Sequence, residues 1–328
     1  MDLLRQASHR YPISLFLLIS FSWTWFFWFG SLLFPNDWAI RKIITAMGFG
    51  PAIAAILLST LRGRSCIANS RKWWCWYGLS FFVLLASYIS MLATGDGVTA
   101  GAFKRATPPG FSTLNILLSV VSAAIGAFII AATFGAKAPV YQGSLSLKRA
   151  VKWLLIATLL PLVWHLAGLF LALMQGQTVP EIQGGLDWFS WLTYSVRSVI
   201  FTLVVVAVGE EVGWRGWLLP ALQQRLSPLL SSVVLGIVWG LWHFPLFVTG
   251  AYQAPPQMVF AKVGLCVFLS ILFTSLYNRS NGNVLVAIAL HTAINSTQRF
   301  VPMTEAMSML MLLTILALLF ADKMWRRM

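Results

Sequence analysis

The sequence predicts an all-α polytopic membrane protein of about ten transmembrane helices with a polar site inside the membrane. Of its 328 residues, 59% are apolar and 10% are charged, and the mean hydropathy is +0.79. A soluble domain carries roughly a quarter charged residues, so this composition sets the class. The site is predicted by the stretch "VGEEVGWRGWLLP", which places two glutamates and an arginine directly after the uncharged run "VIFTLVVVAV".

Apolar runs long enough to cross the bilayer recur along the whole chain. A transmembrane helix needs about 20 mostly apolar residues to span roughly 30 Å of hydrocarbon. The first run continues to Phe34, which is too long for a signal-peptide core, so we expect it to be retained. The predicted spans, of which the sixth and ninth contain polar groups, lie near 12–34, 43–61, 73–93, 113–135, 151–174, 196–222, 229–249, 257–277, 283–298 and 304–321.

The distribution of lysine and arginine predicts that both termini are cytoplasmic. With the N-terminus inside, the cytoplasmic segments hold 16 of the 23 basic residues, and Arg197 and Lys262 fall inside or at the edge of spans. Such an excess of basic residues marks the cytoplasmic side. The outer segments hold Arg41, Lys42, Lys104, Arg105 and Arg299.

The net charge of +14 does not indicate a nucleic-acid-binding protein. Basic residues in this class contact anionic lipid headgroups at the bilayer surface, and the sequence has no compact basic domain. The lipid bilayer is the expected partner, and the sequence does not set the oligomeric state. Cys66, Cys75 and Cys266 are too few and too scattered for a disulfide framework or a metal cluster.

Four polar residues are predicted to lie in one layer of the membrane. Counting 1.5 Å per residue from the predicted helix ends, Glu210 and His243 lie about 22 and 21 Å from the cytoplasmic end, and His291 and Asn295 about 14 and 20 Å. His291 and Asn295 are four residues apart and share a helix face. Ionisable groups at this depth are costly and usually functional. By contrast, we interpret His165 as a hydrogen-bonded structural residue.

The two adjacent glutamates have different expected roles. Glu211 and Arg215 are spaced i, i+4, so we expect a salt bridge along the helix. Glu210 is turned about 100° away and is free to meet His243 and His291. A carboxylate and a histidine around one water form a general-base pair. Glu210, His243 and His291 could also hold Zn²⁺ with an open position for water. Both the metal-free and the zinc mechanism imply hydrolysis by activated water.

Three motifs of this sequence resemble those of a known family. "EEVGWR" matches the EExxxR motif of the CPBP (CAAX protease and bacteriocin-processing, or Abi) intramembrane proteases, which are related to the Rce1-type prenyl proteases. "WGLWH" is similar to the family's FxxxH motif, with Trp239 in place of phenylalanine. "HTAIN" is similar to its HxxxN motif.

The resemblance implies a role for each motif residue. Glu210 would activate water with His243, while His291 and Asn295 would bind the oxyanion. Glu211 and Arg215 would support the motif, and the Trp239 substitution would affect only packing near His243. The family is described as metalloproteases, but the sequence does not decide between Zn²⁺ and no cofactor.

The resemblance also divides the chain and implies its activity. Residues 150–322 would form the protease core, and 1–140 would be transmembrane helices of unassigned role. The implied function is an intramembrane endopeptidase acting on a peptide or membrane-protein substrate. Short loops favour a multi-pass protein of a bacterial inner membrane.

Two other classes are weighed against the protease. A non-catalytic scaffold or bacteriocin-immunity protein could retain all the motifs. A transporter could bind a substrate or proton at the midplane charges, but this interpretation predicts paired repeats, and we find none in the sequence.

Overall fold

The computed structural model describes residues 2–64, 70–94, 110–136, 147–178 and 188–327, and this part of the chain is helical without strands. Cys66, Lys104, Arg105 and Lys137 lie outside the described residues. Cys75 is exposed and Cys266 is buried, and both are free thiols.

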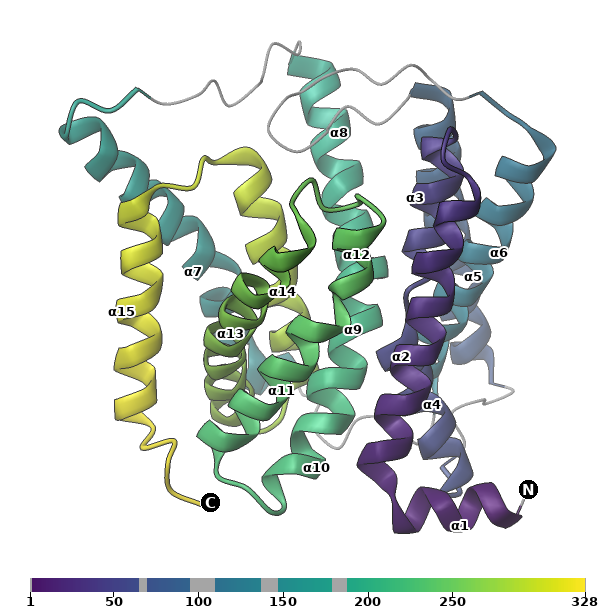
Figure 1. Ribbon diagram of the computed structural model, residues 1–328, viewed down its shortest axis with the longest axis horizontal. Helices are drawn as coiled ribbons and strands as arrows, with labels where there is room; N and C mark the ends of the chain where they lie inside the picture. Colours follow the sequence, from purple (N-terminus) through teal and green to yellow (C-terminus); the bar gives the residue numbers. More distant parts are fainter. Residues whose placement is uncertain (1, 65–69, 95–109, 137–146, 179–187, 328) are drawn as a thin grey trace.

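The first half of the chain builds one side of the helical bundle (Figure 1). A short helix lies ahead of the first span, and the second span is broken into two helices. The elements are α1 (Asp2–Arg10), α2 (Pro12–Gly30), η1 (Ser31–Leu33), α3 (Trp38–Ala46), α4 (Gly50–Leu61), α5 (Arg71–Thr94), α6 (Thr113–Ile130) and the π-helical turn η2 (Ala131–Gly135).

The second half holds the motif helices. One long helical stretch is interrupted twice by π-helical turns, and the next span is broken into two helices. The elements are α7 (Leu147–Met174), α8 (Trp188–Phe201), η3 (Thr202–Ala207), α9 (Val208–Gly213), η4 (Trp214–Leu218), α10 (Leu219–Gln223), α11 (Pro228–Trp242), α12 (Phe244–Val248), η5 (Pro256–Met258), α13 (Val259–Arg279), α14 (Val284–Phe300) and α15 (Glu305–Ala321).

All ten predicted spans are helical. Eight helices in the described part are long and apolar enough to cross a membrane. The other two, α14 and α15, have 17 residues each, or about 25 Å at 1.5 Å per residue, and they run beside the longer helices (Figure 1). Both termini lie at the same end of the bundle (Figure 1), as an even number of crossings requires.

Local sequence places His243 at a break in its helix. Ser227 caps the start of α11 by accepting a hydrogen bond from the Leu230 amide at 3.3 Å, and Pro228 follows as the first helical residue. The helix ends at Trp242 because Pro245 has no amide hydrogen and its ring crowds the preceding turn. His243 therefore sits between α11 and α12.

The N-terminal helices pack directly on the motif helix. A Cβ added at Gly209 would meet the Phe49 ring at 2.8 Å, and one added at Gly213 would meet the Pro51 carbonyl carbon at 2.4 Å. These two glycines therefore let α4 approach α9 closely. This contact gives α4, one of the N-terminal helices, a structural role that the sequence did not assign.

Candidate intramembrane active site

The EExxxR residues lie on α9 and η4, between two π-helical turns. The turns η3 and η4 flank the short α-helix that carries both glutamates. π-Helical turns occur often at functional sites, because one extra residue in a turn changes the direction of the side chains that follow. Glu210, Glu211 and Arg215 are all buried, so the helix turns its charged groups into the protein and away from lipid.

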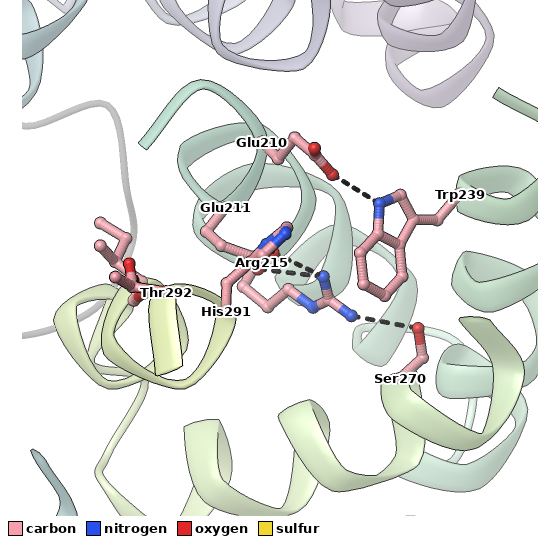
Figure 2. A network of polar contacts seen from close by, with 8 residues as sticks. Glu210, Glu211, Arg215, Trp239, Ser270, His291 and Thr292 are labelled. Carbon is pink, nitrogen blue, oxygen red and sulfur yellow. Dashed lines mark hydrogen bonds and ion pairs between the residues drawn. The ribbon is translucent and has the colours of Figure 1, made fainter. Parts of the chain in front are cut away.

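Glu211 is at the centre of a buried ion-pair network (Figure 2). Arg215 Nη1 donates to both Glu211 oxygens at 3.0 Å, and its Nη2 donates to the Ser270 hydroxyl at 3.1 Å. The guanidinium lies between two aromatic faces, 4.6 Å from the Trp239 ring centroid and 4.1 Å from that of Phe273. The predicted salt bridge is confirmed, and it is completely buried.

His291 pairs with Glu211. Its Nδ1 lies 2.7 Å from Glu211 Oε1, and since that carboxylate also pairs with Arg215, the imidazole N–H donates. The sequence leaves Glu210 free to meet His291. In the structure the hydrogen bond of His291 goes to Glu211, and His291 is still close enough to Glu210 for the two charges to interact. The 100° turn between adjacent residues directs Glu211 toward α13 and α14 and Glu210 toward α11.

Glu210 has a different partner, the indole of Trp239. Trp239 Nε1 donates to Glu210 Oε2 at 2.6 Å (Figure 2). The expectation that tryptophan in place of phenylalanine would affect only packing is wrong, because phenylalanine has no hydrogen to donate. Of the two adjacent glutamates, Glu211 pairs with an arginine on its own helix, and Glu210 is held by the indole of Trp239.

The tautomer of His243 follows from its backbone contact. Its Nδ1 lies 2.7 Å from the Trp239 carbonyl oxygen. A carbonyl only accepts, so Nδ1 carries the hydrogen, and in the neutral ring Nε2 keeps its lone pair. His243 can therefore accept a proton or a hydrogen bond at Nε2, as a general base must.

A cavity of about 690 Å³ brings the candidate residues together. Its walls come from the N-terminal helices α2 and α3 as well as from α9, the α11–α12 junction and α14. Of the predicted site residues, it is lined by Glu210, His243 and Asn295. His291 is not among the described lining residues, and its ring lies against Trp239 and Phe273, at 5.7 and 6.0 Å between centroids.

The cavity also contains polar residues that the motifs did not indicate. Tyr252 lines it from the loop after α12. Arg41 and Arg299 line it with neutral hydrogen-bond partners, the Thr249 carbonyl and the Ser198 hydroxyl. Arg299 could have been found from the sequence, because it continues the i, i+4 series of His291 and Asn295 along α14. Tyr252 had no comparable signal.

The structure shows how the three residues predicted as possible zinc ligands are placed and bonded. Among the described residues, no group of three or more His, Cys, Asp or Glu side chains is arranged to hold a metal ion. Of the three predicted ligands, His291 is hydrogen-bonded to Glu211 and Glu210 to the Trp239 indole. His165, by comparison, is a buried structural residue whose Nδ1 lies 2.8 Å from the Pro161 carbonyl oxygen.

The fold and the site define a helical membrane protein with a carboxylate and a histidine facing one cavity inside the bundle. Residues 189–297 match the family model described as type II CAAX prenyl endopeptidase Rce1-like. This segment is therefore similar to the CPBP/Rce1-type proteases. It is also similar to the CAAX prenyl protease 2 of Methanococcus maripaludis, with 36% identity over 148 residues, 43% of this chain. The match spans 53% of that relative's length.

Proposed function

We propose that this protein is an intramembrane endopeptidase that hydrolyses a peptide bond with water activated by Glu210 and His243. The observation that carries the proposal is that these two side chains, 33 residues apart in sequence on α9 and at the end of α11, line one cavity. A water between them would give a proton to the carboxylate or to His243 Nε2 as its oxygen attacks the amide carbon.

Of the remaining site residues, some can donate hydrogen bonds to the oxyanion and others hold the helices together. Asn295 lines the same cavity, and its amide N–H can donate to the oxyanion of the tetrahedral intermediate. His291, which pairs with Glu211, could assist Asn295 through Nε2 only as an imidazolium, because Nδ1 already carries one hydrogen. Glu211 and Arg215 hold α9 against α13 and α14.

We infer that the substrate is a peptide or a membrane-protein segment. The relative's name indicates prenylated CAAX substrates, and that class is one arm of the test below. The mechanism we propose needs no metal, because Glu210 and His243 supply the base and Asn295 an oxyanion donor.

The proposal also includes the side from which the cavity is reached. The excess of basic residues favours cytoplasmic termini in a bacterial inner membrane. Both termini lie at the end of the bundle opposite α3 and α12 (Figure 1), and both of these helices line the cavity. The cavity would therefore open toward the non-cytoplasmic face, and substrates would be presented there.

The experiment compares wild type with Glu210→Gln in cells and as purified protein. Membrane peptides that accumulate uncleaved in the variant identify substrates, and quenched fluorogenic CAAX peptides with and without a prenyl group test the relative's substrate class. Glu305→Gln, the same change at an exposed residue at the start of α15, is the matched control. Identical peptide profiles in all three strains would favour the non-catalytic scaffold or immunity protein.

A further inference from the structure

Two polar side chains beside the candidate site have no role in the mechanism above. Tyr252 lies in the loop between α12 and η5 and lines the cavity with Glu210 and His243. Lys262 is on the first turn of α13, inside a predicted span. Its charge lies close enough to interact with both Glu210 and His243.

Tyr252 is fixed by contacts that point its ring toward the site. Its amide donates to the Leu246 carbonyl at 2.8 Å. The ring lies nearly parallel to that of His243, with centroids 6.0 Å apart and an interplanar angle of 21°. It also packs edge-on against Phe247 at 5.0 Å. A loop residue held on three sides keeps its hydroxyl in a defined place.

The ring of Tyr252 lies beside an ammonium group. Lys262 Nζ is 5.4 Å from the centre of the tyrosine ring. An ammonium has no lone pair, so it cannot accept the phenolic hydrogen. The phenolic hydrogen is thereby left for a group in the cavity. Burial raises the pKa of Tyr252, so the hydroxyl carries its proton at neutral pH.

We propose that Tyr252, positioned and charge-stabilised by Lys262, is the catalytic acid that protonates the leaving amine. This inference rests on the proposed hydrolase function. It separates two tasks, because Glu210 and His243 would act on the water and Tyr252 on the other side of the scissile bond. An amide cannot lose its nitrogen without a proton, so a dedicated donor is a chemical requirement of the reaction.

The steps balance without another reactant. Water adds to the carbonyl carbon and gives one proton to Glu210. The C–N bond then breaks, the nitrogen takes the phenolic proton of Tyr252, and the tyrosinate is left beside the Lys262 ammonium. The proton on Glu210 returns to Tyr252 through water that enters as the amine leaves. The net change is one amide and one water to one carboxylic acid and one amine.

The test uses two bonds that differ in their need for an acid. The first substrate is a peptide that the purified wild type cleaves, and the second is the 4-nitrophenyl ester of its acyl part, whose leaving group departs without a proton. Tyr252→Phe keeps the ring contacts and removes the hydroxyl. It should lower kcat for the amide by about 10²-fold or more, the lower range for an acid catalyst, with KM unchanged and ester hydrolysis within about threefold of wild type.

Lys262 is tested as a positioning residue. Lys262→Met should also slow the amide reaction selectively, and Lys262→Arg, which keeps the charge, should restore part of the rate. Tyr277→Phe, on the same helix as Lys262 and outside the described cavity lining, is the control and should match wild type on both substrates.

The outcomes separate this inference from the proposed function. The acid role would be overturned if Tyr252→Phe cleaved the amide at the wild-type rate. It would also be overturned if the variant lost the same factor in kcat on the amide and on the ester, per folded molecule. Glu210→Gln should lose both reactions, because the ester also needs activated water. If Glu210→Gln keeps both activities, the proposed function itself is wrong, whatever Tyr252→Phe does.

Discussion

Replacing each of the two adjacent glutamates by glutamine should separate folding from catalysis. Glu211 bonds to Arg215 and His291, and Arg215 is fully buried. In Glu211→Gln, the guanidinium keeps its hydrogen bond to Ser270 and its two aromatic faces but loses its counter-charge. Breaking a buried pair in this way costs about 3–5 kcal/mol. At about 2 °C per kcal/mol for a large domain, Tm should fall by roughly 6–10 °C.

Glu210→Gln should behave in the opposite way. Its carboxylate accepts one hydrogen bond, from the Trp239 indole, and the glutamine amide oxygen can accept the same bond. Removing a buried negative charge that has no cation bonded to it costs little and can stabilise the fold. Stability should therefore change by less than about 1 kcal/mol, while activity should fall by about 10²–10⁴-fold, the range for loss of a general base.

The assay measures Tm and cleavage per folded molecule for both proteins in detergent. The two variants have the same chemical change at neighbouring positions, so each is the control for the other. A Glu211→Gln protein as stable as wild type would refute the assignment of Glu211 as the structural centre. An active Glu210→Gln protein would refute the catalytic assignment, and one that unfolds would show that Glu210 is part of the structural network.

The other predictions follow from single contacts. Trp239→Phe should keep the ring packing but lower kcat, because Glu210 loses its hydrogen bond; a wild-type rate would show that the indole N–H is dispensable. Gly213→Ala should lower Tm because its Cβ would lie 2.4 Å from the backbone of α4, whereas Gly264→Ala, with open space on α13, should not. Exhaustive chelation should leave activity intact, and stoichiometric bound zinc would contradict the metal-free mechanism. In intact cells, Gln253→Cys should react with an impermeant maleimide, and a C-terminal reporter should be cytoplasmic; the reverse pattern would overturn the orientation.

The transmembrane helices could be predicted because composition alone determines them. The uncharged run of α6 and η2, for example, has 23 residues and is long enough to cross the hydrocarbon core. The internal breaks were less visible. The α11–α12 break follows from Pro245, whose effect on a helix is known, but the π-helical turns on both sides of α9 have no comparable sequence signal.

The residues of the candidate site could be predicted, but the pairing between them could not. The i, i+4 rule identified the Glu211–Arg215 contact because both residues share one helix. The partner of His291 depends on how α14 packs against α9, and that packing is set by side chains spread over several helices. The sequence therefore does not tell which of the two adjacent glutamates accepts the hydrogen bond of His291, and the structure shows that it is Glu211.

The role of the first four spans was hidden for a related reason. They carry no charged motif, and the contact of α4 with α9 depends on shape. Gly209 and Gly213 are spaced i, i+4, so they form one smooth face of α9, and such small-residue faces allow close helix packing in membranes. The sequence "VGEEVG" thus has two signals: the acidic pair indicates the site, and the glycine pair indicates close helix packing.

Lys262 is a charged residue inside a predicted span. An ionisable residue inside a span is a functional candidate by default, because its burial in lipid is costly unless it has a partner. That rule identifies Glu210 and the histidines, and it applies equally to Lys262. Its partner Tyr252 is ten residues earlier, in the turn between two helices, where neither periodicity nor motif spacing applies. The fold joins them because the loop after α12 leads through η5 into α13, so that Tyr252 contacts both Lys262 and the ring of His243. A lysine inside a span that has no acid near it in sequence therefore predicts a polar partner elsewhere, and here the partner lies in the adjoining loop.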